Sequence, residues 1–161
     1  MTRHSLVCSL AVAVSMGSSG VIFAQELKGC KVEVTTPKSG DPVGARMQVT
    51  GTATVPAGLY LWIFARKEGQ RKWWPQGGGN AEVKKTGRWV ADAAFGDEND
   101  LKKDAGATFE ITAVIVDGDA HKELRTYVKT SEADNRYPGT DLPQAAPTGC
   151  SLKDDLIVKR R

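Results

Sequence analysis

The chain has 161 residues, of which 25% are charged, and its formal net charge at pH 7 is +3. A charge this small does not indicate nucleic-acid binding, which requires a strongly basic surface. Domains most often contain about 100 to 150 residues, so this length fits one folded domain.

Residues 1–24 have the pattern of a secretory signal peptide. A basic start is followed by the apolar run Leu6–Val14 and then by small residues. We expect cleavage after Ala24, with Gly20 as the alternative, which leaves residues 25–161 as a single domain. A retained membrane anchor is disfavoured because serines and glycines make the segment weakly apolar. The sequence therefore predicts an exported protein, periplasmic or extracellular, with no stable membrane span after processing.

Cys30 and Cys150 are the two cysteines that remain after this cleavage. An even number of cysteines in an oxidising compartment predicts a disulfide. In the chain-entropy model a closed loop of about 120 residues contributes about 4–5 kcal/mol. Two free thiols are the alternative. A structural zinc site is a poor explanation, since it needs four ligands and one histidine remains. We expect no metal and no cofactor.

Most of the remaining chain has the composition of short β-strands separated by turns. Strands are predicted at Lys31–Thr35, Met47–Thr54, Leu59–Arg66, Lys72–Pro75, Thr108–Val116 and Asp155–Arg160. A hairpin is predicted from Ala81–Lys85 and Arg88–Phe95, around the turn Thr86-Gly87. Seven or eight such strands fit an antiparallel sandwich or a barrel. The varied loop lengths favour the sandwich, which we expect to be immunoglobulin-like.

One short helix is predicted from Ala120 to about Lys129. Apolar residues recur there at helical spacing, and Asp119 precedes them as a candidate N-cap. The proline- and glycine-rich segment that follows, 131–149, is expected to be an extended crossing or a loop.

The segment Leu59–Phe64 is apolar on both faces, which predicts a central strand covered on both sides. The predicted helix or the loop near Tyr137 could provide the second cover. In immunoglobulin-like sandwiches a tryptophan of the third strand packs in the core, so we expect Trp62 there. Trp89 alternates with small apolar residues and is also expected in the core.

Trp73 and Trp74 point to opposite sides if they lie in a strand, so one of them is expected at the surface. Its neighbours include Arg66, Arg71 and Lys72. An exposed indole among cations suits a sugar ring, an anionic glycan or an aromatic partner. These five residues are the candidate ligand-binding residues. The alternative is that the second ring covers the sheet edge or lies beneath an arginine.

Two acidic segments are candidate metal sites. The loop 97–104 has oxygen ligands that suit calcium, but lysines interrupt it, which favours a solvated loop. Asp117, Asp119 and His121 occur at every second position, but a helix cap and an exposed histidine explain them better. No nucleophile elbow occurs, and His121 is the one histidine that remains after cleavage, so we expect no catalytic residues.

Four stretches together resemble a small β-sandwich module of bacterial exported and membrane-anchored proteins. They are LYLWIFARKEGQRKWWPQGG, GRWVADAAFG, FEITAVIVD and RYPGTDLP. The similarity covers residues 31–160, and its most specific element is the combination of Leu-Trp with Trp-Trp-Pro-Gln-Gly-Gly. The resemblance implies the sandwich fold and export. It implies no activity and no site residue, and the pair Cys30 and Cys150 is not part of its pattern.

The sequence as a whole predicts a monomeric, non-catalytic binding or interaction module whose ligand is a glycan or an envelope component. A structural envelope protein that packs on a partner chain is the alternative, and a small glycan-active enzyme is the third hypothesis. Glycan binding predicts an exposed aromatic ring in a shallow groove. A partner interface predicts a larger, flat apolar patch, and an enzyme predicts a concave site with perturbed titratable groups.

Overall fold

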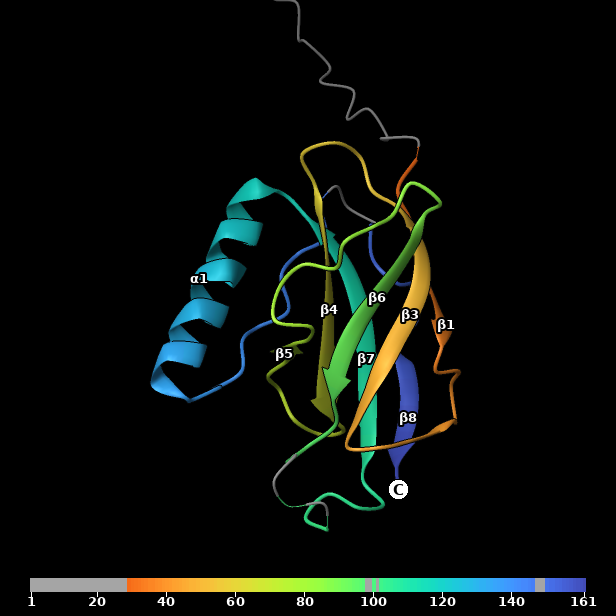
Figure 1. The fold of residues 1–161 in the computed structure, drawn as a ribbon, viewed down its shortest axis with the longest axis vertical. Helices are drawn as coiled ribbons and strands as arrows, with labels where there is room; N and C mark the ends of the chain where they lie inside the picture. The colour runs from red at the N-terminus through yellow and green to blue at the C-terminus, as the bar shows by residue number, and fades with distance from the viewer. Residues whose placement is uncertain (1–28, 98–99, 101, 147–149) are drawn as a thin grey trace, which may run out of the picture.

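The computed structural model describes residues 29–97, 100, 102–146 and 150–161. The predicted signal peptide lies outside these residues. Two β-sheets pack against each other, and a helix lies beside the outer face of one of them (Figure 1). The predicted β-sandwich with one helix is therefore confirmed. Within the described part of the chain, no helix is long and apolar enough to cross a bilayer.

The order of the strands is that of an immunoglobulin-like sandwich. The first sheet, in the order β1-β3-β6, contains β1 (Lys31–Thr36), β3 (Arg46–Thr54) and β6 (Arg88–Ala94). The second sheet, in the order β2-β8-β7-β4-β5, contains β2 (Pro42–Val43), β8 (Leu156–Arg160), β7 (Thr108–Val116), β4 (Tyr60–Lys67) and β5 (Trp74–Pro75). Neighbouring strands are antiparallel except for the short parallel pair β2 and β8. The helix α1 (Gly118–Asp134) lies in the connection from β7 to β8.

The inner core fills the space between the two sheets. Trp89 is buried there, as predicted, and packs over Gly51 of the neighbouring strand β3. A Cβ atom at Gly51 would overlap the Trp89 ring and the carbonyl oxygen of Glu33, so only glycine fits at this position. Cys150 belongs to the same core, and the predicted disulfide with Cys30 is present.

An outer core fills the space between the second sheet and α1. Trp62 and Phe64 of β4 pack there with Leu124 and Val128 of the helix. Trp62 is completely buried, as predicted, but it lies in the core beneath the helix and not in the core between the sheets. Leu61 and its alternate neighbours occupy the inner face of β4, and strand alternation then directs Trp62 outward. The helix provides the second cover that the apolar segment predicted.

The helix is longer than predicted and has a different N-cap. Asp117, not Asp119, has extended backbone geometry, and its carboxylate accepts a hydrogen bond from the backbone N–H of Ala120 at 2.9 Å. Asp119 lies in the first turn, where a negative charge favours the helix dipole. The helix ends at Asn135 in a left-handed conformation. The start of the segment predicted as a crossing is therefore helical.

The predicted hairpin between Ala81–Lys85 and β6 is wrong. The turn itself forms, with the N–H of Gly87 donating to the carbonyl of Lys84 at 2.8 Å. However, β6 pairs with β3 along its whole length, and Ala81 makes only an isolated bridge to Leu61 of the other sheet. The alternating small and aromatic residues of β6 pack better on the long strand β3 than on a short polar segment.

Candidate ligand-binding groove

Trp73 is a structural residue of the outer core. Its side chain is 4% exposed, and the guanidinium carbon of Arg66 lies 4.3 Å from the centroid of its ring. This is a cation–π contact. Glu110 accepts a hydrogen bond from Nε of Arg66 at 2.7 Å, so the guanidinium is paired. A ring beneath an arginine was one alternative from the sequence, and it applies to Trp73.

Trp74 is half-buried at the edge strand β5 and is held in one orientation. Its indole N–H donates to the carbonyl of Tyr137 at 3.0 Å. The ring packs on Gly139, where an added Cβ atom would lie 3.1 Å from two ring carbons. The N–H of Gly139 in turn donates to the hydroxyl of Tyr127 at 3.0 Å. Backbone and side-chain contacts thus fix the indole on one side.

The segment 137–141, which follows the helix, is fastened to the tryptophan pair. Trp73 and Thr140 exchange two backbone hydrogen bonds of 2.8 Å. Lys72 and Asp141 form an ion pair at 2.9 Å. The segment therefore extends the edge of the second sheet and positions the side chain of Tyr137, which is 52% exposed.

Gln76 connects the two sheets. Its side-chain oxygen accepts a hydrogen bond from the N–H of Ala94 at the end of β6, and its side-chain nitrogen donates to the carbonyl of Trp74, both at 2.8 Å. Gly77 has a φ of 75° and comes close to Ala91, with 3.4 Å between an added Cβ atom and the Ala91 Cβ. The Pro-Gln-Gly part of the motif is therefore a structural link.

A groove of about 1030 Å³ opens between this link, β6 and the C-terminal half of α1. Its lining includes Trp74, Gln76, Gly77, Asp92, Tyr127 and Tyr137. A smaller hollow of about 670 Å³ lies where β3 joins β4, against the turn 80–87. The larger groove is the candidate site because its lining combines aromatic side chains, among them Trp74, Tyr127 and Tyr137, with polar ones.

The structure brings two of the five candidate residues to this groove. Trp74 and Arg66 line it, whereas Trp73 is buried below it. Arg71 and Lys72 are exposed outside its lining. The sequence did not indicate Tyr127 or Tyr137 as binding residues. Tyr127 contributed only to the helical spacing of apolar residues, and the loop near Tyr137 was expected only to cover the sheet.

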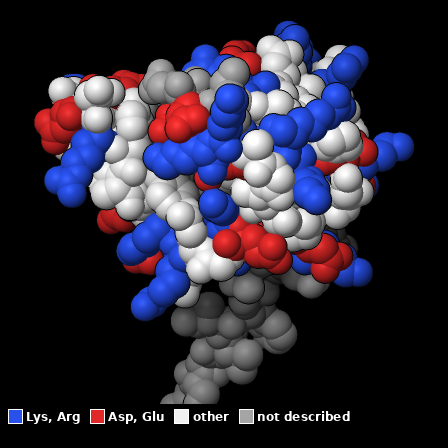
Figure 2. Space-filling model, turned by 90° about the horizontal axis from the view of Figure 1, so that it is seen from below, with Lys and Arg blue, Asp and Glu red and all other residues white. Residues whose placement is uncertain are grey.

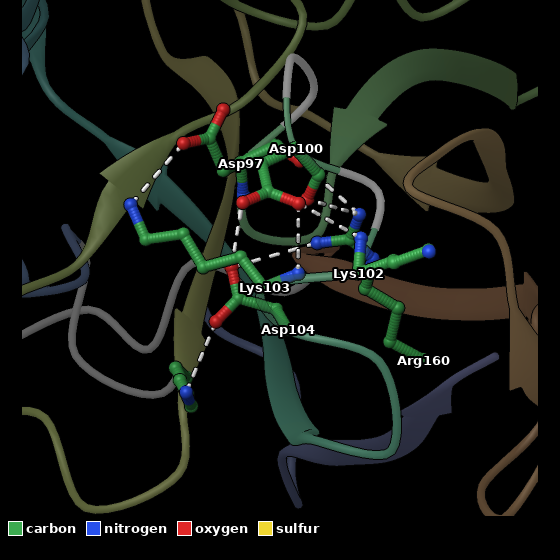
Figure 3. Close-up of polar contacts among 7 residues, drawn as sticks. Asp97, Asp100, Lys102, Lys103, Asp104 and Arg160 are labelled. Atoms are coloured by element: carbon green, nitrogen blue, oxygen red, sulfur yellow. Dashed lines mark hydrogen bonds and ion pairs between the residues drawn. The ribbon is translucent and has the colours of Figure 1, made fainter.

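A buried arginine organises the lower end of the sandwich. Arg160 is 1% exposed and pairs with Asp104 at 3.5 Å. Its guanidinium also donates to the backbone carbonyls of Asp97 and Asp100, at 3.1 and 3.5 Å (Figure 3). Arg160 follows Val158 on the inward face of β8, so the apolar face of this strand ends in a charge. The sequence predicted the strand β8 but not the burial of Arg160.

Asp104 is the centre of this cluster. The backbone N–H of Asp97 and the ammonium of Lys67 each donate to it at 3.0 Å. The hydrogen bond from Asp97 and then that from Lys67 hold the pKa of Asp104 below its ordinary value. Lys103 pairs with Asp97 at 3.2 Å. The carboxylates of Asp97 and Asp104 therefore bind cations of the protein itself, and the predicted solvated loop is wrong for Asp104, which is buried.

Acidic and basic side chains are interspersed over this end of the molecule. Figure 2 shows no broad area of a single sign on the face seen from below. Among the residues with described positions, no three histidine, cysteine or acidic side chains are grouped so that they could hold a metal ion. Part of the loop 97–104, namely residues 98, 99 and 101, lies outside the described residues.

His121 is half-buried on the first turn of α1, so the predicted exposed position is wrong. Its ring stacks on Tyr60, with 3.7 Å between the centroids and an interplanar angle of 8°. Its Nδ1 atom accepts a hydrogen bond from the indole N–H of Trp62 at 3.2 Å. Burial, and secondly the charge of Arg125, lower the pKa of His121. This histidine joins the helix to the sheet.

Comparison of the chain with models of known protein families and with curated protein sequences finds no significant match.

Proposed function

We propose that this protein is an exported, non-catalytic module that binds a carbohydrate in the groove lined by Trp74, Tyr127 and Tyr137. The observation that supports this function is the position of these three rings around one groove with polar side chains between them. A sugar ring presents an apolar C–H face, which stacks on aromatic side chains, and hydroxyl groups, which need hydrogen-bond partners. The groove offers both kinds of contact.

The groove is also preorganised. The indole of Trp74 and the hydroxyl of Tyr127 are each held by hydrogen bonds to the segment 137–139, at 3.0 Å. Side chains that are already ordered lose little conformational entropy when a ligand binds, so more of the contact energy contributes to affinity.

Export is supported by the bond between Cys30 and Cys150. Structural disulfides form and persist in oxidising compartments, whereas cytosolic thiols are kept reduced. The bond agrees with the signal-peptide pattern at the start of the sequence.

Asp104 is an acid of the groove lining with a perturbed pKa, as a catalytic carboxyl group can have. Its pKa is lowered, which does not suit a general acid. The partners of Asp104 are Lys67, Arg160 and the backbone of Asp97, all within the protein. These contacts support a structural role for this carboxylate.

Binding can be tested with the variant Tyr137→Ala, measured against a polysaccharide panel by affinity gel electrophoresis and calorimetry. Tyr137 is half exposed, so its loss should leave the melting temperature within the range of plain surface substitutions. Loss of one stacking ring should weaken binding about tenfold, or about 1.4 kcal/mol.

Ile157→Ala is the matched control, since Ile157 is 39% exposed on β8, which β7 and β4 separate from β5 in the same sheet. It should leave the affinity unchanged. If no polysaccharide binds, or if the two variants bind equally well, carbohydrate binding in this groove is wrong.

A further inference from the structure

We infer that the groove takes a neutral polysaccharide rather than an acidic one; this rests on the proposed carbohydrate binding and specifies its ligand class. The inference comes from the charges that line the groove, their partners and the remaining hydrogen-bond acceptors.

The charges of the lining balance. Its cations are Arg46, Arg66, Lys67 and Lys103. Its anions are Asp92, Asp97, Asp104 and Glu132. Four positive and four negative side chains give a formal charge of zero. A groove of zero net charge does not attract a polyanion over a distance, in contrast to clefts lined by one sign of charge.

Three of the four cations of the groove pair with carboxylates of the protein. Arg66 pairs with Glu110 through its Nε at 2.7 Å. Lys67 pairs with Asp104 at 3.0 Å, and Lys103 pairs with Asp97 at 3.2 Å. An acidic sugar would have to compete with these carboxylates for each cation, and it would desolvate its own charge without a new partner. The cations near the tryptophan pair therefore give an acidic ligand little advantage.

Asp92 of β6 and Glu132 of α1 are exposed carboxylates on the groove lining. Carboxylates accept hydrogen bonds from sugar hydroxyls, and such charge-assisted bonds are stronger than those between neutral groups. The same two groups would repel the carboxylate or sulfate of an acidic polysaccharide. Both effects favour a ligand that brings many hydroxyl donors and no charge.

The aromatic side chains of the groove also favour an uncharged ligand. The N–H of Trp74 is already bonded to the carbonyl of Tyr137, so the indole can offer a ligand its apolar face. Stacking on this face uses the C–H surface of a pyranose and requires no ligand charge.

The test compares neutral polymers with their own carboxymethylated forms. Dextran, laminarin and xylan, each in both forms, are measured against the full mature protein by calorimetry. A neutral polymer should bind, and its carboxymethylated form should bind about tenfold more weakly. Affinity should stay constant between about 50 and about 300 mM NaCl, because no net charge is neutralised on binding.

Asp92→Asn should reduce the affinity for the neutral polymer about fivefold, because a charged acceptor becomes a neutral amide. Asp155→Asn, an exposed carboxylate outside the groove, is its control and should have no effect. Tighter binding of a carboxymethylated polymer that still depends on Tyr137, or a steep loss of affinity with salt, would overturn the neutral ligand class and leave carbohydrate binding intact. Binding of neither form, or binding that ignores Tyr137→Ala, would overturn both proposals.

Discussion

The two faces of strand β4 support different parts of the molecule. Leu61 and Ile63 pack in the inner core between the sheets, and Trp62 and Phe64 pack in the outer core beneath α1. The inner core is enclosed by paired strands and contains one end of the disulfide. The outer core is covered by a helix, and one of its contacts is a hydrogen bond from Trp62 to His121.

One strand can therefore contribute to two layers that open at different free energies. Strands of the inner core are tied to their neighbours by backbone hydrogen bonds. The helix makes its contact with the sheet through side chains such as Leu124 and Val128. Elements attached only by side chains usually open at a lower free energy than paired strands, so we expect the outer layer to open first.

The largest effect should come from the disulfide of the inner layer. The double variant Cys30→Ser, Cys150→Ser removes a bond between residues 120 positions apart. The chain-entropy model gives a loss of about 4–5 kcal/mol for such a loop. Chemical denaturation of the variant and of the oxidised protein measures this difference. Mass spectrometry of the untreated mature protein is the check, and two alkylatable thiols there would contradict the bond.

Trp62 of the outer core and Trp89 of the inner core allow a direct comparison of the layers. Trp62→Ala and Trp89→Ala should each cost about 3–5 kcal/mol, since both side chains are fully buried. The two variants should differ in which amide groups exchange their hydrogens faster. Trp62→Ala should speed exchange in α1 before the sheets are affected, whereas Trp89→Ala should speed exchange in both sheets together. Equal exchange patterns in the two variants would mean that the layers open as one unit.

The smallest effect should come from protonation of His121 in the outer layer. Its pKa in the folded protein lies below the ordinary value of about 6.5. The unfolded chain therefore binds more protons as the pH falls, so the stabilisation is complete above pH 6.5 and is lost at lower pH. Protonation also converts Nδ1 into a donor, which removes the acceptor of the Trp62 indole. Denaturation midpoints measured from about pH 7.5 to about pH 5 should show this loss.

His121→Phe keeps a ring on Tyr60 but removes the acceptor. It should lower stability at neutral pH by about 1–3 kcal/mol, because a buried indole N–H is left without its partner. The pH dependence in that range should then disappear. A variant that retains the full dependence would assign the titration to another group.

Local sequence determined most of the strands and the disulfide. Alternation in the segments of β1 and β8 predicted these strands, because a strand with one buried face repeats every second residue. The β-branched residues of the β7 segment predicted that strand. The two remaining cysteines predicted their bond, because pairing in an oxidising compartment depends on number and location. Apolar residues on both faces of β4 predicted a covered outer face.

Only the tertiary structure decided which layer each side chain joins. Alternation places Trp62 and Leu61 on opposite faces but does not say which face meets the other sheet. Arg160 is buried because Asp104 and two carbonyl groups from a distant loop meet it. Trp74, Tyr127 and Tyr137 line one groove because the helix and the segment after it fold back over β5. Such contacts join residues far apart in the chain, and their geometry depends on the packing of whole elements, which no local pattern encodes.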